Sequence, residues 1–335
     1  MSLSTDNPEF KLGVFSANLS SGLAVTTIPE RWEATWENNL RMAELADAAD
    51  IDFILPVARY RGYGGVTDFE GSGMDPITLT AAMLARTKRI TVFSTVHTAF
   101  THPLLAARQL GTCDQIGPGR AGLNIVAGWN RPEYDMFGID LPEAHPDRYA
   151  YAQEWIDVVR LLWTSEDPVT YKGEYFRIKD ALVKPRPADP LPLLNAGSSD
   201  EGRAYGARNV DYVFTLVGNA EQGEPIAAGI RQAAVQQFGR DVGVMTTSHI
   251  VCRPTETEAL DFVHYYAEEH ADWDAVDNLM AGLGMTAKTF TPEQLRTFRP
   301  RFASGHGSVP IFGNPDQVAD QIAAFARAGF AGITI

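Results

Sequence analysis

An asparagine inside an apolar run is the first candidate for chemistry in this sequence. Residues 123–126 read Leu-Asn-Ile-Val, which is typical of a buried strand, and a polar loop with Arg131 and Glu133 follows. A buried amide without a partner costs roughly 2–7 kcal/mol, so such a residue needs a reason to be there. Asn124 is therefore either a satisfied structural amide or a ligand-facing group at the end of a strand.

Two more apolar runs also end in polar side chains. Residues 58–65 read Ala-Arg-Tyr-Arg-Gly-Tyr-Gly-Gly. Arginine pairs with anions and stacks on rings, so this loop favours a flat or anionic ligand. The alternative is a solvated loop in which arginine packs on tyrosine. Thr95 and His97 close the other run, and both His97 and Trp129 could equally be packing residues.

A Gly-Ser-Ser turn gives a third kind of site. Residues 196–200, Ala-Gly-Ser-Ser-Asp, lie between an apolar run and a helical pattern. Free N–H groups and hydroxyls at a helix start can bind an anion, although Ser199 could also be an ordinary helix cap. The seven histidines show no metal-ligand spacing. There is no G-x-S-x-G elbow, no P-loop and no G-x-G-x-x-G after a strand. These absences point to a bound organic cofactor.

Alternating strands and helices must position these residues. Strand patterns fall at 12–18, 53–57, 90–95, 122–127, 193–196, 212–217, 244–251 and 332–335. Helical patterns fall between them, at 32–49, 76–86, 103–115, 146–163, 199–208, 224–238, 255–269 and 314–329. This order predicts a single (β/α)8 barrel of the TIM type over residues 1–335, with a doubly wound open sheet as the alternative. In such barrels the active site collects at the carboxyl ends of the strands.

Residues 270–311 interrupt this pattern before the last helix. Their Gly, Ser, Thr and Pro content predicts a partly mobile insertion that serves as a lid. The pattern stops on strand 332–335 with no closing helix, which leaves open a truncated chain or a barrel that ends early.

Composition narrows the class of protein. The chain has 335 residues, of which 45% are hydrophobic, and 28 basic against 42 acidic residues give a net charge of −14. This balance argues against nucleic acid or an anionic membrane as partner. Two cysteines cannot form a disulfide framework and suggest a reducing compartment. No signal core or membrane-spanning run is present, so we expect a soluble cytoplasmic protein.

Several longer tracts resemble one known family. The chain is similar to the bacterial-luciferase-like flavin monooxygenases, and within them to the pyrimidine (uracil) monooxygenases. The tracts occur in family order at 59–69, 93–109, 124–139, 147–163, 171–176 and 195–208. The resemblance implies a two-component enzyme in which a separate NAD(P)H:flavin reductase supplies reduced FMN, with O2 and a small organic molecule as co-substrates. It also implies a homodimer or homotetramer and no metal.

The resemblance implies roles for individual residues. Family contacts to FMN fall on Ala58, Arg59, Asn124, Glu133, Arg148, Tyr149 and Ser199. Thr95 and Asn124 match the pair thought to hold O2 near flavin N5 and give an N5-peroxide, whereas sulfone and sulfonate monooxygenases lack the threonine. The implied substrate is a small electrophilic heterocycle or amide-like compound.

Two alternatives stay open beside this reading. One is a sulfone or alkanesulfonate monooxygenase, and the other is a non-catalytic flavin-binding protein. The chain departs from the uracil enzyme at 58–59, with Ala-Arg for Ile-Lys, and at 195–198, with Asn-Ala-Gly-Ser for Cys-Ala-Gly-Gln. These departures leave the identity of the substrate open.

Overall fold

A closed ring of parallel strands forms the centre of the protein. The computed structural model describes residues 9–286 and 289–335. Neighbours in the ring pair in parallel, and the pairings β8–β9 and β1–β11 close it. The predicted (β/α)8 barrel is therefore confirmed, and the open sheet is excluded. In ring order the strands are β1 (Lys11–Phe15), β2 (Phe53–Leu55), β3 (Thr91–His97), β4 (Ala121–Val126), β7 (Leu193–Asn195), β8 (Tyr212–Phe214), β9 (Gly243–Cys252) and β11 (Gly332–Thr334).

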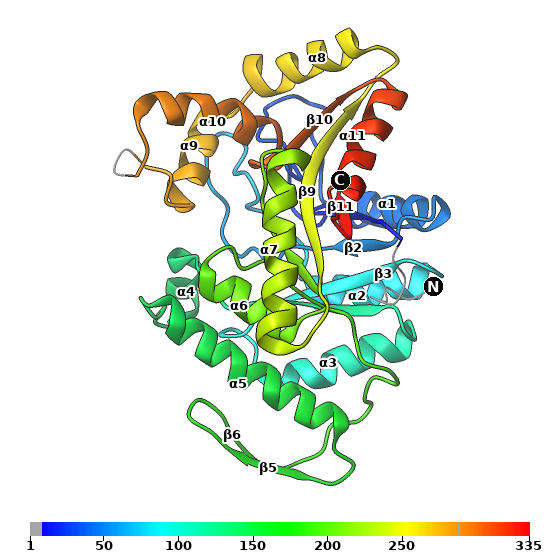
Figure 1. The fold of residues 1–335 in the computed structure, drawn as a ribbon, viewed down its shortest axis with the longest axis vertical. Helices are drawn as coiled ribbons and strands as arrows, with labels where there is room; N and C mark the ends of the chain where they lie inside the picture. Colours follow the sequence, from blue (N-terminus) through cyan, green and yellow to red (C-terminus); the bar gives the residue numbers. More distant parts are fainter. Residues whose placement is uncertain (1–8, 287–288) are drawn as a thin grey trace.

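Amphipathic helices cover the outside of this ring (Figure 1). In α5, Trp155, Val158, Val159 and Leu162 form the buried stripe that helical periodicity predicts. None of the helices formed by residues 9–286 and 289–335 is long and apolar enough to cross a bilayer. The covering helices are α1 (Trp36–Ala48), α2 (Pro76–Arg86), α3 (Pro103–Ile116), α5 (His145–Thr164), α6 (Asp200–Asn209), α7 (Ala220–Phe238) and α11 (Pro315–Arg327).

Side-chain alternation along the strands separates two apolar layers. Ile54 and Val92 belong to the core between strands and helices, whereas their neighbours Phe53 and Phe93 belong to a separate cluster inside the ring. That inner cluster, which also holds Leu55, Leu194, Tyr212, Phe214 and Met245, fills the barrel. Polar side chains that continue the inward-facing series therefore lie above this plug, at the carboxyl ends of the strands.

The sequence pattern did not predict several short elements. The loop after α5 carries an antiparallel hairpin of β5 (Val169–Lys172) and β6 (Arg177–Ala181). A short helix, α4 (Arg131–Phe137), follows β4 directly. Strand β9 runs on beyond the ring and pairs in parallel with β10 (Val309–Gly313).

The insertion at 270–311 is more regular than its composition predicted. It holds α9 (Trp273–Gly282) and α10 (Pro292–Gly305), after α8 (Glu256–His264) and the π-helical turn η1 (Tyr265–Glu269), while residues 287–288 lie outside the described part. A capping box of Thr291 and Gln294 starts α10, and Asp272 caps α9. Apolar residues at helical spacing bury these helices in a cluster with Phe69 and Val25. The partial mobility of the segment stays a prediction. Its closure as a lid stays a prediction.

Candidate functional site

Thr95 and Asn124 lie side by side at the carboxyl ends of β3 and β4. They are register partners, and each is 6% exposed. The Thr95 hydroxyl donates to the Pro56 carbonyl at 2.5 Å, and Asn124 Nδ2 donates to the Thr95 oxygen at 3.1 Å. A carbonyl can only accept, so the single hydroxyl proton of Thr95 is committed to Pro56. The direction of this chain therefore requires Asn124 to present its nitrogen, not its oxygen, to Thr95.

This arrangement leaves part of Asn124 free. Its Oδ1 is buried and has no hydrogen-bond partner among the described residues. Its Nδ2 uses one of two hydrogens in the bond to Thr95. Asn124 is thus anchored at one end, as a structural amide is, and unpaired at the other, as a ligand-facing group is. A buried orphan of this kind is expected where a ligand supplies the missing partner.

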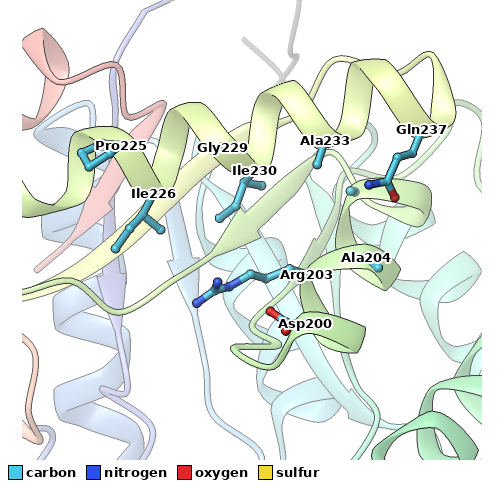
Figure 2. Close-up of a pocket in the computed structure, with 10 residues that line it drawn as sticks. Asp200, Arg203, Ala204, Pro225, Ile226, Gly229, Ile230, Ala233 and Gln237 are labelled. Carbon is cyan, nitrogen blue, oxygen red and sulfur yellow. The ribbon is translucent and has the colours of Figure 1, made fainter.

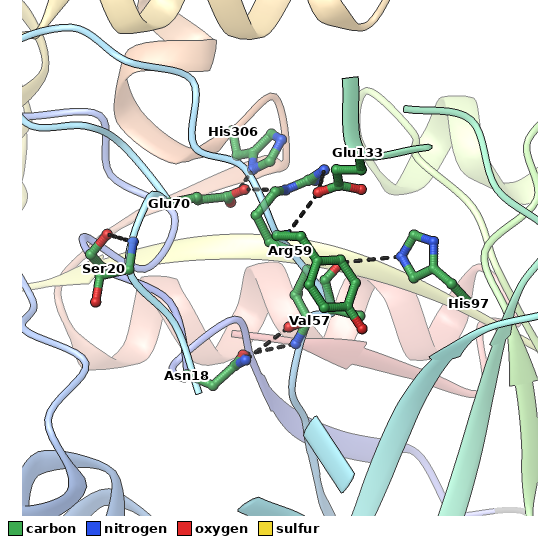
Figure 3. A network of polar contacts seen from close by, with 11 residues as sticks. Asn18, Ser20, Val57, Arg59, Glu70, His97, Glu133 and His306 are labelled. Carbon is green, nitrogen blue, oxygen red and sulfur yellow. Dashed lines mark hydrogen bonds and ion pairs between the residues drawn. The ribbon is translucent and has the colours of Figure 1, made fainter. Parts of the chain in front are cut away.

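A buried ionic network stands beside this pair, after β2. Arg59 Nε lies 3.0 Å from Glu70, and its Nη1 lies 3.2 Å from Glu133. His306, at the end of α10, reaches the other oxygen of Glu70 at 3.1 Å (Figure 3). The Arg59 side chain is 7% exposed and stacks near Trp129, with 5.2 Å to the ring centroid. Arg59 also lies over the Tyr63 ring, 5.1 Å from its centroid, as the alternative interpretation predicts, although its guanidinium is buried and not solvated. An anionic ligand would have to compete with Glu70 and Glu133 for this guanidinium.

Charge pairing favours the ionised forms of Glu70 and Arg59. Burial by itself raises the pKa of Glu70, but His306 and Arg59 outweigh it, so the pKa lies below its usual value. Burial likewise lowers the pKa of Arg59, and the carboxylates of Glu70 and Glu133 outweigh that effect. The sequence reasoning missed Glu70 and His306, and no local pattern marks either residue.

Glu133 links α4 to the loop after β2. One carboxylate oxygen accepts from the backbone N–H of Tyr60 at 2.9 Å and from Arg59. The other oxygen is buried without a partner in the described part of the chain. Glu133 therefore braces the loop while keeping one acceptor unused.

The start of α6 forms a second cluster of the expected residues. Ser199 is the N-cap and accepts from the N–H of Gly202 at 3.1 Å. A Cβ on either Gly197 or Gly202 would lie 2.5 Å from the Tyr149 hydroxyl, so both glycines are needed for this close approach. Burial raises the pKa of Tyr149, and a hydrogen bond to Ser199 opposes the rise. The ordinary-cap interpretation of Ser199 is correct, and the capped turn also carries backbone N–H groups suited to an anion.

Arg148 lies next to this cluster in sequence, but its hydrogen bonds go elsewhere. It donates to the carbonyls of Pro142 at 2.6 Å and Glu143 at 2.9 Å, which ties down the loop before α5. The side chain is half-buried, so a ligand would have to compete with these carbonyls.

Ala58 is the last of the flavin contacts that the resemblance implies, and it is a hydrogen-bond partner of His97, a candidate from the strand pattern. The Nε2–H of His97 donates to the carbonyl of Ala58 at 3.2 Å, and its ring stacks on Phe100 at 5.0 Å. Burial lowers the pKa of His97 to about 4, so the ring is neutral near pH 7. The stacked ring and the hydrogen bond of Nε2 agree with the interpretation of His97 as a packing residue. Its Nδ1, however, is buried and has no hydrogen-bond partner in the described ranges.

A groove of about 370 Å³ between α6 and α7 is unrelated to these groups. Figure 2 shows its lining, with Arg203 from one helix and Ile226, Ile230 and Gln237 from the other. It lies between two covering helices and extends to Asp200, the first residue of α6, but none of the site residues described above lines it. The candidate site is instead the edge formed by the carboxyl ends of β2, β3, β4 and β7, which are neighbours in the ring.

Known proteins share both the sequence and the fold. The profile of the family described as Luciferase-like monooxygenase matches residues 10–332. Pyrimidine monooxygenase RutA of Enterobacter sp. strain 638 is 35% identical over 271 residues, covering 79% of this chain and 74% of that protein. Riboflavin lyase RcaE, solved with a modified FMN and riboflavin, superposes with a TM-score of 0.85 at 20% identity, over 97% of this chain and 86% of that chain. EDTA monooxygenase EmoA from Chelativorans sp. BNC1 gives 0.78 at 22% identity, over 97% and 88%.

The two solved structures show a shared fold, because their identities are low. The family profile spans nearly the whole chain, and the pyrimidine monooxygenase matches most of it. The strand-end site described above lies within the residues that the family profile matches. The chain therefore belongs to the luciferase-like monooxygenase family.

Proposed function

We propose that this enzyme uses reduced FMN and O2 to oxygenate a small electrophilic heterocycle or amide-like compound. The observation that carries the proposal is the Thr95–Asn124 pair, whose buried amide keeps one oxygen without a partner. A purely structural pair would use both ends of the amide, since an unpaired buried group costs about 1–3 kcal/mol.

The residues present fit a flavin mononucleotide. The phosphate end is assigned to Ser199 and Tyr149, where two glycines leave room and the start of α6 supplies N–H donors and a positive dipole end. Arg148 adds positive charge nearby. The ring end is assigned to Ala58, Asn124 and Glu133, which hold two unpartnered buried oxygens between them. Arg59 then acts by holding Glu133, not by touching an anion.

Bound reduced FMN would supply the two electrons that O2 activation requires. The protein's own contribution is orientation. Thr95, through Pro56, fixes which end of the Asn124 amide is nitrogen and which is oxygen. One N–H donor and one acceptor are thereby presented in a fixed order, and they would hold O2 beside the bound reduced flavin.

Two features favour this function over its alternatives. Thr95 is the residue that the family resemblance associates with pyrimidine-type rather than sulfonate-type enzymes. A relative named pyrimidine monooxygenase matches 79% of the chain. Membership of the luciferase-like monooxygenase family favours an enzyme over a non-catalytic flavin-binding protein. The lack of a dinucleotide-binding loop in the sequence supports a separate NAD(P)H:flavin reductase as the source of reduced flavin.

The test couples the protein to a generic flavin reductase with NADH and FMN. Consumption of O2 and formation of product are followed with uracil, with other N-heterocycles and amides, and with alkanesulfonates and sulfones. We expect an oxygenated heterocycle or amide and no sulfite. Release of sulfite would support the sulfonate alternative, and flavin binding without product from any class would support the non-catalytic one.

A further inference from the structure

A second cavity lies on the same face of the barrel, at the ends of β1, β9 and β11. It measures about 380 Å³, and its walls include Phe15, Val251, Phe262, Tyr266 and His249. Phe15 also stacks on Phe214 of the barrel plug, with ring centroids 6.3 Å apart. One wall of this cavity is therefore continuous with the inside of the barrel mouth.

The insertion helps to build this cavity. Ser304 of α10 and Tyr266 of η1 line it, opposite the segment that follows β1. That segment is tied to the insertion by backbone bonds from Val25 to Ala303 and from Thr27 to His270. Figure 1 shows this dark blue segment beside β10 and α10.

His249 is held in one tautomer at this cavity. Its Nδ1 lies 2.8 Å from the Ser308 hydroxyl, and that hydroxyl donates to the carbonyl of Gly305 at 2.6 Å. Since the only hydroxyl proton goes to Gly305, Nδ1 must carry a proton and donate to Ser308. Nε2 is then a lone-pair acceptor, and it has no partner in the described part of the chain.

The surroundings keep this ring neutral. Burial lowers the pKa of His249 to about 3, and the nearby Arg301 adds to the effect. Arg301 donates to the carbonyls of Ser308 and Val217, so it is fixed in place. The positive charge of Arg301 would repel a cationic ligand group, whereas it would not repel a neutral hydrogen-bond donor.

A second unpartnered group lines the same cavity. Ser21 is 3% exposed, and its hydroxyl has no hydrogen bond to any described residue. Two other polar groups in the walls are satisfied: Tyr266 donates to the carbonyl of Ser304 at 2.9 Å, and Thr26 donates to that of His270 at 3.1 Å. The exposed residues Glu30 and Arg31 also line the cavity. Its buried part thus offers one obligatory acceptor, one hydroxyl and an otherwise largely apolar wall.

We propose that this cavity binds the organic substrate, and that His249 Nε2 accepts a hydrogen bond from a neutral N–H of a cyclic amide or imide. The Ser21 hydroxyl then donates to a carbonyl of the same ligand. The proposal rests on the function proposed above and names the residues that select the substrate. Ser308 is a positioning residue, because it sets the tautomer of His249 without facing the ligand's N–H.

The test compares matched ligands in the flavin-free protein. Uracil and 2-pyridone carry the N–H, and 1,3-dimethyluracil and N-methyl-2-pyridone lack it. We expect the N–H forms to bind at least about tenfold more tightly, the scale set by one buried hydrogen bond and its loss. In protein labelled with ¹⁵N-histidine, only the N–H forms should shift the His249 Nε2 resonance, and this measurement needs no variant.

Variants separate the two contacts. His249→Phe should reduce the affinity ratio of N–H to N-methyl forms to about one. His264→Phe makes the same change at an exposed histidine of α8 and should leave the ratio intact. Ser21→Ala should weaken both forms several-fold while the ratio persists.

Three outcomes would overturn the pocket: equal binding of N–H and N-methyl forms, no binding of either, or an unchanged ratio in His249→Phe. A different result would contradict the proposed function: the protein would bind these amides with the predicted preference but would oxygenate none of them with reduced FMN. Conversely, if His249→Phe leaves turnover unchanged, the proposed substrate pocket is wrong while the proposed function stands.

Discussion

Replacing Thr95 with valine tests the assignment of the strand-end pair. Valine keeps the branched shape but loses the hydroxyl, which both donates to Pro56 and accepts from Asn124. The Pro56 carbonyl and the Asn124 amide are then left without these partners in a site that is 6% exposed. At about 1–3 kcal/mol for each unpaired buried group, the free energy of unfolding should fall by about 2–6 kcal/mol.

The catalytic effect follows from the lost orientation. Without the Thr95 oxygen as acceptor, nothing in this contact distinguishes the nitrogen of the Asn124 amide from its oxygen. We expect coupled product to fall at least about tenfold, which corresponds to about 1.4 kcal/mol. The affinity for reduced FMN should change less than about threefold, because Thr95 is not among the expected flavin contacts. The remaining flavin oxidation should yield H2O2.

The assay measures product, H2O2 and NADH consumed at equal concentrations of folded protein, well below the melting temperature. Thr95→Ser is the matched control, since serine keeps both hydrogen bonds and loses only a methyl group, worth about 0.8 kcal/mol. It should retain most of the coupling. Full coupled turnover in Thr95→Val would refute the reasoning, because the hydroxyl would then be dispensable for orienting Asn124.

Four further outcomes are expected. Ser199→Asp should keep the cap of α6 yet weaken binding of reduced FMN by about 1–3 kcal/mol, because the carboxylate repels the phosphate. Ser199→Ala should weaken this binding by about 0.5–2 kcal/mol. If an anaerobic titration shows unchanged affinity in Ser199→Asp, the phosphate lies elsewhere. The protein should purify nearly colourless and prefer reduced over oxidised FMN, so stoichiometric yellow flavin after gel filtration contradicts a borrowed cofactor. The pKa of His97 is about 4 and that of His249 about 3 in the folded protein, against about 6.5 unfolded. The unfolded state therefore binds more protons, and stability decreases as the pH is lowered through this window. Each histidine should remove about 2 kcal/mol between pH 7 and pH 5, and urea unfolding curves that coincide at the two pH values argue against neutral buried rings. Finally, limited proteolysis should cut within residues 270–311 first and more slowly with reduced FMN and substrate; equal rates with and without ligands would make the insertion a fixed subdomain.

Pattern alone was enough for the barrel and for one part of its site. Strands that alternate with amphipathic helices have few ways to bury their apolar faces, so the architecture follows from periodicity. Parallel strands all end on one face, so Thr95, Asn124 and Ser199 could be placed at the same edge from their positions after apolar runs. The two helices of the insertion were not predicted, although Val276, Leu279 and Met280 of α9 lie at helical spacing and are buried.

The sequence by itself determined the order of the eight ring strands, the helices that cover them and the kinds of polar group that reach the barrel mouth, because these depend on local periodicity and chain direction. Only the tertiary structure decided what those groups do. It joins His306 to Glu70 and Arg59, and a backbone carbonyl 39 residues before Thr95 sets the direction of the amide of Asn124. Hydrogen bonds and ion pairs act over about 3 Å between residues far apart in the chain. Their partners are therefore chosen by packing and register, which no local pattern encodes.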